Sequence, residues 1–405
     1  MKRFSSRLLA CVCALALCLS PLRPAISCPL CLSPGQTLSE AVSEADIVVL
    51  TQFVEAIRKT PDSEASGVVY QTLETMKGEW KEKRIQLDRF EFGQPGDLYL
   101  LTGKHKPSKS GDEKLNKAAS VEWLSPKEVS EVAFRYVQQA PNKEASGAER
   151  MKYFLKFLEV ADVTISNDAY GEFATAPYED VVAVKEHFPR EKLRQWIRNA
   201  QSATATPVKV RSGLYCMMLG HCGDASDEKL LESLLTYTPK DEFPLGKDGA
   251  IAGYLLLTGE RGLQKIEELY LSNPKAPTVD LLTVRTALSF LWSYEPTRFP
   301  KDRLRSALRL LLDRKELVTD VISDLSRWSD WKAQPRIISM LTSSSDEHVR
   351  RAGVAYLLIS IDSGKKPEEK LPHVEEAKVV IAKLRETEPR LVKEAEILLK
   401  RPVRP

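Results

Sequence analysis

The sequence predicts an α+β protein with more than one domain, in which a small antiparallel β-barrel is followed by an all-α solenoid. Two observations support this fold class. Residues 45–102 contain short β-branched runs separated by turn residues, which is typical of a small barrel or sandwich. Residues 151–399 consist almost entirely of segments whose apolar residues recur at three- and four-residue steps, which is typical of helices.

The first 27 residues have the composition of a secretion signal. Three basic residues precede an apolar run over residues 8–19, and Ala25-Ile26-Ser27 stands directly before Cys28. We therefore expect the mature chain to begin at Cys28 and to be exported to the periplasm, the cell surface or the medium. An uncleaved anchor is the alternative, but the run is shorter than the about 20 apolar residues that a spanning helix needs, and no later run approaches that length.

The bulk composition indicates a folded protein and argues against a nucleic-acid binder. Of 405 residues, 43% are hydrophobic and 28% are charged, which is enough apolar material for a sizeable core. The 59 basic residues are nearly matched by 56 acidic ones, for a net charge of +3. A nucleic-acid-binding domain normally shows a clear basic excess, so none is expected here.

Four of the seven cysteines lie beyond the signal, at Cys28, Cys31, Cys216 and Cys222. In an exported protein this number suggests two disulfides. Local pairing would join Cys28 to Cys31 and Cys216 to Cys222, although three connectivities are open. The CxxC spacing also occurs in redox-active pairs, but these usually open a helix in a βαβ unit, and a structural role is favoured. Acylation of Cys28 is a further hypothesis, and it would tether the chain to a membrane surface.

Residues 28–125 are expected to form the β module. A β-branched run over residues 45–54 predicts the first strand, and residues 68–73 predict a second. Residues 98–101 follow a Pro-Gly-Asp turn and predict another strand. The polar and basic residues 103–119 predict a long exposed loop.

Residues 126–148 predict one helix, over residues 126–140, and a linker. Residues 149–405 then predict helix pairs joined by short loops and repeated at roughly 40 residues, which indicates a HEAT-like solenoid. An irregular helical bundle is the alternative. Because solenoids expose long concave surfaces, their usual role is to bind other proteins.

No motif predicts a catalytic, cofactor or metal site. The sequence has no GxSxG, Walker A or HExxH pattern, and no GxGxxG that opens a helix. Cys216, His221 and Cys222 are metal-ligand types, but five residues separate the two cysteines, whereas zinc sites prefer pairs two to four residues apart. The five histidines are scattered, and we expect most of them to be surface residues: His105, His187, His221, His348 and His373.

Three tryptophans lie close together in the sequence, at Trp292, Trp328 and Trp331, and Arg327 precedes the second of them. Aromatic residues beside arginine can form a binding hot spot. The same residues at helical spacing more often belong to the core, which is the favoured interpretation.

The N-terminal module resembles the netrin-type OB barrel of the tissue inhibitors of metalloproteinases. The resemblance rests on an early cysteine, on residues 45–50, on the strand over residues 70–78 that ends in Lys-Gly, and on the segment 95–101. It implies an OB-like barrel. In the inhibitors the N-terminal cysteine chelates the zinc of the protease, and Cys28 would hold that position, although this chain has CxxC where the inhibitors have CxC.

Most of the chain is also similar to a group of uncharacterised secreted bacterial proteins that combine a Cys-rich N-terminus, a β module and HEAT-like helices. The matching stretches are residues 168–174, 176–178, 213–220 and 252–259. This resemblance implies the same domain order and no established activity.

The sequence therefore favours a non-enzymatic exported protein that binds a partner protein of unknown identity through the concave surface of a helical solenoid. No cofactor is expected. A metalloprotease inhibitor that acts through a free Cys28 amine is one alternative. A hydrolase with a site assembled from scattered residues is another.

Overall fold

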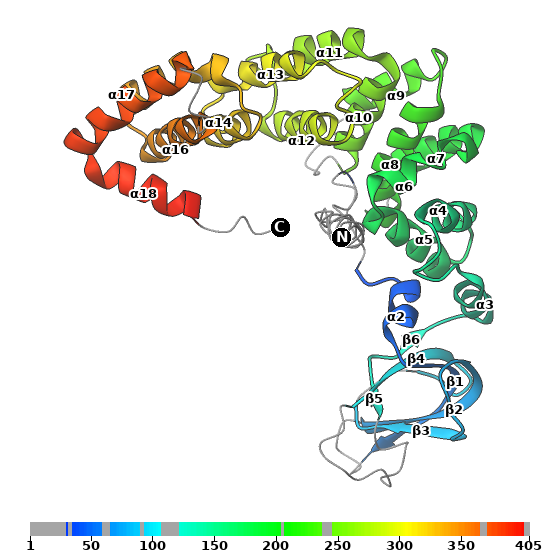
Figure 1. The fold of residues 1–405 in the computed structure, drawn as a ribbon. Helices are drawn as coiled ribbons and strands as arrows, with labels where there is room; N and C mark the ends of the chain where they lie inside the picture. Colours follow the sequence, from blue (N-terminus) through cyan, green and yellow to red (C-terminus); the bar gives the residue numbers. More distant parts are fainter. Residues whose placement is uncertain are drawn as a thin grey trace, which may run out of the picture. The chain divides into compact units, whose positions relative to one another are not determined.

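The computed structural model describes residues 30, 35–58, 65–89, 93–106, 121–203, 206–236, 245–364 and 371–400. It has an N-terminal antiparallel sheet followed by a largely helical region, which confirms the α+β multidomain class (Figure 1). The chain divides into two compact units, one of residues Met1–Pro29 and Ser33–Val184 and one of residues Leu30–Leu32 and Lys185–Pro405. The predicted signal, Cys28, Cys31 and most of the predicted loop lie outside the described residues.

The described part of the first unit contains a sheet of six antiparallel strands. These are β1 (Ile47–Arg58), β2 (Ala65–Lys77), β3 (Arg84–Leu87), β4 (Leu98–His105), β5 (Val121–Trp123) and β6 (Lys127–Glu128). Their order is β3-β2-β1-β4-β5, and β6 also pairs with β4. The register of β1 against β2 shifts at four places, and such bulges bend and twist a sheet. The sheet curls into a half-barrel, and among the described strands no pairing between β3 and β5 closes it.

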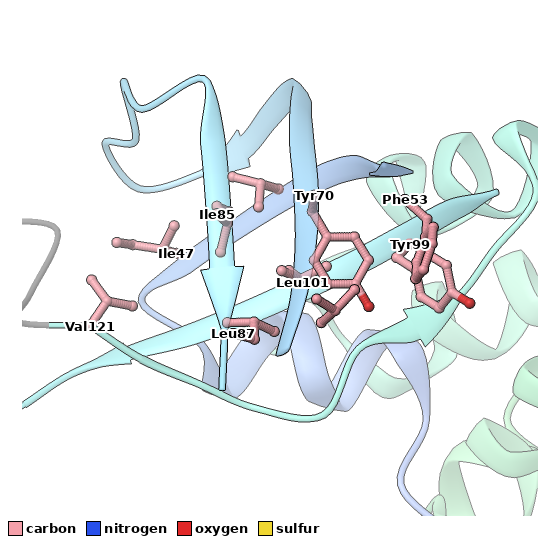
Figure 2. Close-up of a cluster of buried hydrophobic side chains, with 10 residues drawn as sticks. Ile47, Phe53, Tyr70, Ile85, Leu87, Tyr99, Leu101 and Val121 are labelled. Atoms are coloured by element: carbon pink, nitrogen blue, oxygen red, sulfur yellow. The ribbon is translucent and has the colours of Figure 1, made fainter. Parts of the chain in front are cut away.

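One face of the curled sheet carries the core of this module (Figure 2). Phe53, Tyr70 and Tyr99 contact one another at centroid distances of 5.3 to 6.3 Å, and aliphatic residues from the other strands complete the cluster. Val48 and Leu50 alternate with these inward residues in β1 and are buried as well. Because both faces of β1 are covered, its sequence is a continuous apolar run instead of an alternating one.

Five α-helices of the first unit have a described structure. These are α2 (Leu38–Glu44), α3 (Glu131–Gln139), α4 (Gly147–Phe154), α5 (Val163–Thr175) and α6 (Tyr178–Val182), with a short 3-10 turn η2 (Leu155–Phe157) after α4. Four of them begin at a side chain that accepts a hydrogen bond from a first-turn N–H: Thr37, Ser130, Ser146 and Asp162. The predicted helix over 126–140 therefore starts late, because Ser130 caps it and residues 127–128 form β6.

The second unit consists of helices. These are η3 (Lys185–His187), α7 (Arg190–Ser202), α8 (Thr206–Cys222), α9 (Glu228–Leu235), α10 (Lys247–Thr258), α11 (Glu260–Ile266), η4 (Glu267–Leu271), α12 (Thr278–Tyr294), α13 (Lys301–Arg309), η5 (Leu310–Asp313), α14 (Val318–Arg327), η6 (Trp331–Ala333), α15 (Gln334–Ser343), α16 (Glu347–Ser363), α17 (Pro372–Thr387) and α18 (Pro389–Lys400). None of the helices in the described ranges combines the length and apolar content needed to cross a bilayer.

These helices form successive hairpins, as the sequence predicts. Their first helices are α7, α9, α11, α13, α15 and α17, so a hairpin recurs every 32 to 41 residues. The second helices lie in a row in which α8 contacts α10, α10 contacts α12, and α16 contacts both α14 and α18 (Figure 1). The helices α4 to α6 belong to the first compact unit, whereas the sequence-based limits assign residues from 149 onward to the helical domain.

Ion pairs join neighbouring hairpins of the second unit at regular intervals. Lys247 of α10 binds Asp280 of α12 at 2.7 Å, and both side chains are buried. Arg285 of α12 binds Asp324 of α14 at 2.5 Å, and Arg303 of α13 binds the carboxylate of Glu267 at 2.6 Å. Each pair joins residues 33 to 39 positions apart, so the interaction recurs with the hairpin.

Glycines allow α8 and α10 to approach each other at backbone distance. A Cβ atom on Gly220 would lie 2.7 Å from the Cα of Gly253, and one on Gly249 would lie 2.6 Å from the carbonyl carbon of Gly213. Real Cβ contacts are not this short, so only glycine fits. This spacing explains why glycine recurs in the segments 213–220 and 246–253.

We expect Gly220→Ala to destabilise the second unit by about 1–3 kcal/mol, because the new methyl group forces α8 and α10 apart. Urea unfolding followed by circular dichroism measures the change, and Ser233→Ala on the exposed face of α9 is the control. An unchanged unfolding midpoint for Gly220→Ala would contradict the close approach of the two helices.

Candidate functional site

Two buried carboxylates stand out in the first unit. Asp168 and Glu172 lie one turn apart on α5, and their residues are only 6% and 2% exposed. The i, i+4 spacing places both on the same face of the helix. The surrounding residues of α5 are mostly apolar and buried, so these two acids are the exception on an otherwise hydrophobic helix.

Both carboxylates bind the first turn of α2. Asp168 accepts a hydrogen bond from the backbone N–H of Leu38 through Oδ1, and one from the hydroxyl of Tyr136 at 2.9 Å through Oδ2. Glu172 accepts from the hydroxyl of Thr37 at 2.5 Å and forms an ion pair with Arg150. All four carboxylate oxygens therefore have a donor, and the negative charge lies at the positive end of a helix.

The burial of this cluster changes its acid–base behaviour. Desolvation raises the pKa of Asp168 to about 6, although the bonds from Leu38 and Tyr136 act in the opposite direction. Burial likewise raises the pKa of Glu172, and it raises the pKa of the Tyr136 hydroxyl. Near neutral pH Asp168 thus titrates within the range where small changes of environment alter its charge.

The opposite end of α2 is bound by the sheet. The Nζ of Lys77, the last residue of β2, donates to the carbonyl oxygens of Val42 and Ser43, both at 2.9 Å. A cation at the C-terminal end of a helix is favourable because the carbonyl ends carry partial negative charge. Gly78 follows with a φ of 73°, in close contact with the backbone of Asp46. The Lys-Gly pair of the sequence is thus a cap for α2.

A small polar pocket of about 130 Å³ adjoins Glu172. Its charged lining residues are Glu40, Lys143, Arg150, Glu172 and Asp180. Burial raises the pKa of the Asp180 carboxyl. Within the ranges that the structure describes, no group of three His, Cys, Asp or Glu side chains is arranged to hold a metal ion. Since Asp168 and Glu172 use their oxygens to hold α2, the arrangement joins structural elements and leaves neither acid available for proton transfer.

The sequence analysis did not single out Asp168 and Glu172, because acidic residues are numerous along the chain. The sequence nevertheless contains a pattern that indicates their burial. Two acids at helical spacing in a segment where Ile165, Ala169 and Phe173 predict burial can be accommodated only if each finds a donor.

The structure brings two of the three predicted binding tryptophans together. Trp292 of α12 stacks on Trp328 with a centroid distance of 4.4 Å and an interplanar angle of 5°. Lys301 and Arg305 lie 5.0 and 5.2 Å from the centroid of Trp292. Trp328 is buried and Trp292 is half-buried, and the exposed Arg327 pairs with Asp324.

A Schellman turn at the end of α14 positions Trp328. The N–H of Asp330 donates to the carbonyl of Leu325 at 2.9 Å, and the N–H of Ser329 donates to that of Ser326 at 3.0 Å. Ser329 has a φ of 52°, which glycine adopts more readily. The turn directs Trp331 away from the stacked pair, and its ring lies against His373 and Tyr356 at 5.3 and 5.4 Å.

The expected disulfide between Cys216 and Cys222 is wrong, because both carry free thiols. They lie six residues apart on α8, and a helix rises about 1.5 Å per residue, so their Cα atoms are too far apart for a disulfide. Burial raises the pKa of the Cys222 thiol to about 11, and that of Cys216 is raised as well. The expected pairing of Cys28 with Cys31 and the lipidation of Cys28 fall outside the described residues.

The histidines behave as expected with one exception. His105, His187 and His348 are exposed, and His373 is half-buried. The side chain of His221 is buried, with Nε2 3.9 Å from a carboxylate oxygen of Glu295. Burial lowers the pKa of His221 to about 4, so its ring is neutral at pH 7.

The second unit has a groove of about 340 Å³ between α14, α16 and α18. Small residues form much of its surface, among them Ser323 of α14 and Ala352 and Ala355 of α16. The exposed aliphatic residues Leu398 and Leu399 of α18 border it. The sequence predicted a binding surface on the helices but could not locate it, because the groove is assembled from three hairpins.

Comparison of the chain with models of known protein families, with curated proteins and with solved structures gives no match. The resemblances noted in the sequence remain predictions, and the candidate sites are assessed on their geometry.

We expect Asp168→Asn to alter how the stability of the first unit depends on pH. Because the pKa of Asp168 is raised in the folded protein, folding favours the protonated acid. This contribution to the free energy of unfolding is present below about pH 4 and is lost as the pH rises through about 6. Relative to the wild type, Asp168→Asn should therefore gain about 2–3 kcal/mol between pH 4 and pH 7. Hydrogen exchange of the α5 amides, followed as a function of urea concentration, measures this change in the free energy of unfolding. A stability difference that stays constant over this range would contradict the burial of a titrating Asp168.

We expect Ser329→Gly to stabilise the second unit by about 0.5–1 kcal/mol, because glycine adopts the positive φ without steric cost. Ser323→Gly, within α14, is the control and should destabilise the unit by about 1 kcal/mol. Thermal unfolding shows whether each variant is more or less stable than the wild type. A loss of stability in both variants would argue against strain at Ser329.

Proposed function

We propose that this chain is an exported, non-enzymatic protein that binds a partner protein through the inner face of its helical region. The observation that carries the proposal is the groove between α14, α16 and α18. Helices with small side chains along a groove admit a helix or an extended segment of another protein.

The chemistry of the groove suits a peptide segment. Ala352, Ala355 and Ile359 of α16 offer apolar contacts, while Asp320 and Arg351 supply charges of opposite sign. An apolar surface with a few placed polar groups combines affinity with orientation, as in known peptide-binding grooves.

The groove is held in shape by contacts that do not depend on a partner. Asp324 of α14 is buried and binds both Arg285 and Arg327. Arg351 pairs with Glu394 of α18 at 2.8 Å, which ties α18 to α16. A preformed surface loses less conformational freedom on binding, so more of its contact energy appears as affinity.

The alternatives have weaker support. No observation supports an inhibitor that uses the amine of Cys28, because Cys28 lies outside the described residues. A hydrolase needs an available acid or nucleophile. The two buried acids on α5 whose pKa is raised, Asp168 and Glu172, already bind α2.

We expect Ala355→Trp to abolish partner binding, because the indole fills the groove. A photoreactive residue at Ser323 should crosslink one partner in native extracts, and Ala355→Trp should remove that product by at least about tenfold. Ser306→Trp on the exposed face of α13 is the matched control and should leave crosslinking intact.

Circular dichroism confirms that both tryptophan variants are folded. The proposal fails if the wild type gives no product from Ser323, or if Ala355→Trp crosslinks as well as Ser306→Trp.

A further inference from the structure

The first turn of α2 is held by two acids that differ in their donors. Glu172 forms an ion pair with Arg150. Asp168 is also buried, but the donors bound to it within the described residues are both neutral, namely the backbone N–H of Leu38 and the hydroxyl of Tyr136. A buried carboxylate without a paired cation is costly in its charged form. Of the two acids, Asp168 is therefore the one that gains more from taking up a proton.

Other charges around Asp168 do not remove this cost. The charged and titratable groups that act on the two acids or respond to them come from five elements, and they are Glu40 of α2, Lys127 of β6, Tyr136 of α3, Arg150 and Tyr153 of α4, and Glu172 of α5. Lys127 favours the charged form of Asp168, but its Nζ binds the carbonyl oxygen of Gln36 at 3.2 Å. Desolvation, together with the like charge of Glu172 one turn away, raises the pKa of Asp168 to about 6.

The opposite end of α2 is held without any carboxylate. Lys77 of the sheet donates to the carbonyl oxygens of Val42 and Ser43, and the N–H of Ala45 donates to the carbonyl oxygen of Ala41. A change in the charge of Asp168 therefore acts on the first turn of α2 and leaves the end bound by Lys77 in place.

We propose that α2 and Asp168 form a proton-dependent latch, in which uptake of a proton by Asp168 closes the first turn of α2 onto α5. Protonated Asp168 can donate its hydrogen to the hydroxyl oxygen of Tyr136 and still accept from the N–H of Leu38 through its carbonyl oxygen. The contact thus survives protonation, and the repulsion between Asp168 and Glu172 disappears. This inference goes beyond the proposed function, because it concerns the first unit and no residue of the partner groove.

The direction of the effect follows from the acid that α2 covers. Opening of the first turn removes Leu38 from Oδ1 of Asp168 and admits water to the carboxylate, so the pKa of the acid returns toward its ordinary value. Closure therefore takes up a proton. Its favourable contribution is fully present below about pH 4 and is lost as the pH rises through about 6.

Amide hydrogen exchange of the full-length protein without denaturant tests the latch, because exchange at Leu38 requires the first turn of α2 to open. Between pH 5 and pH 8 the protection factor of the Leu38 amide, corrected for the intrinsic effect of pH on exchange, should fall about tenfold. The Ala45 amide, at the end held by Lys77, should keep its protection.

Three variants distinguish the latch from a purely structural contact. Asp168→Asn keeps an acceptor for Leu38 but takes up no proton, so the protection of the Leu38 amide should become nearly independent of pH. Tyr136→Phe removes a donor from the ionised form, so the midpoint of the pH dependence should move upward. Glu172→Gln is the matched control. It loses the ion pair with Arg150 and should weaken closure, but it should retain a pH dependence.

Two results would overturn the proposal: a Leu38 protection factor that is the same at pH 5 and pH 8 in the wild type, or a pH dependence that persists unchanged in Asp168→Asn. If Asp168→Asn did not fold, as judged by circular dichroism, an unmoved midpoint in Tyr136→Phe would overturn it as well. Crosslinking from Ser323 reports on the partner groove separately, so either proposal can fail while the other stands.

Discussion

The contact between α5 and the first turn of α2 is the interaction on which the first unit depends. Asp168 and Glu172 are buried, so each negative charge must be matched by donors at that place, and Leu38, Thr37, Tyr136 and Arg150 supply them. Lys77 binds the other end of α2 from the sheet. A seven-residue helix is too short to be stable alone, so these end contacts fix its position and thereby join the sheet to the helices of the same unit.

The helical unit uses the same chemistry in a repeated form. A cation on one hairpin pairs with a carboxylate on the next. The pair of Lys247 and Asp280 is buried, so loss of either partner would leave an uncompensated charge in the interior. Glycines let α8 and α10 meet at backbone distance. Directed ion pairs and close backbone contacts both resist sliding of one hairpin past the next, which is consistent with the proposed role of the helical unit in binding a partner.

The proposed partner groove is assembled from three hairpins of the helical unit. The groove beside Ser323 lies among small side chains, where a foreign segment can approach the helices. The end of α18 borders this groove with the exposed aliphatic residues Leu398 and Leu399.

The sequence by itself determined the class of the fold and most of its local structure. The β-branched run over residues 45–54 predicts a strand, and the structure has β1 there. Helices begin at Thr37, Ser130 and Asp162 through short-range bonds, which depend only on neighbouring residues. Tertiary structure alone decided that the sheet stops at a half-barrel, that Cys216 and Cys222 stay apart, and that Trp328 stacks on Trp292. It also decided the role of Asp168, because its partner Leu38 is 130 residues away. Local patterns act over one or two turns, whereas a buried charge is governed by whichever donors the folded chain brings to it.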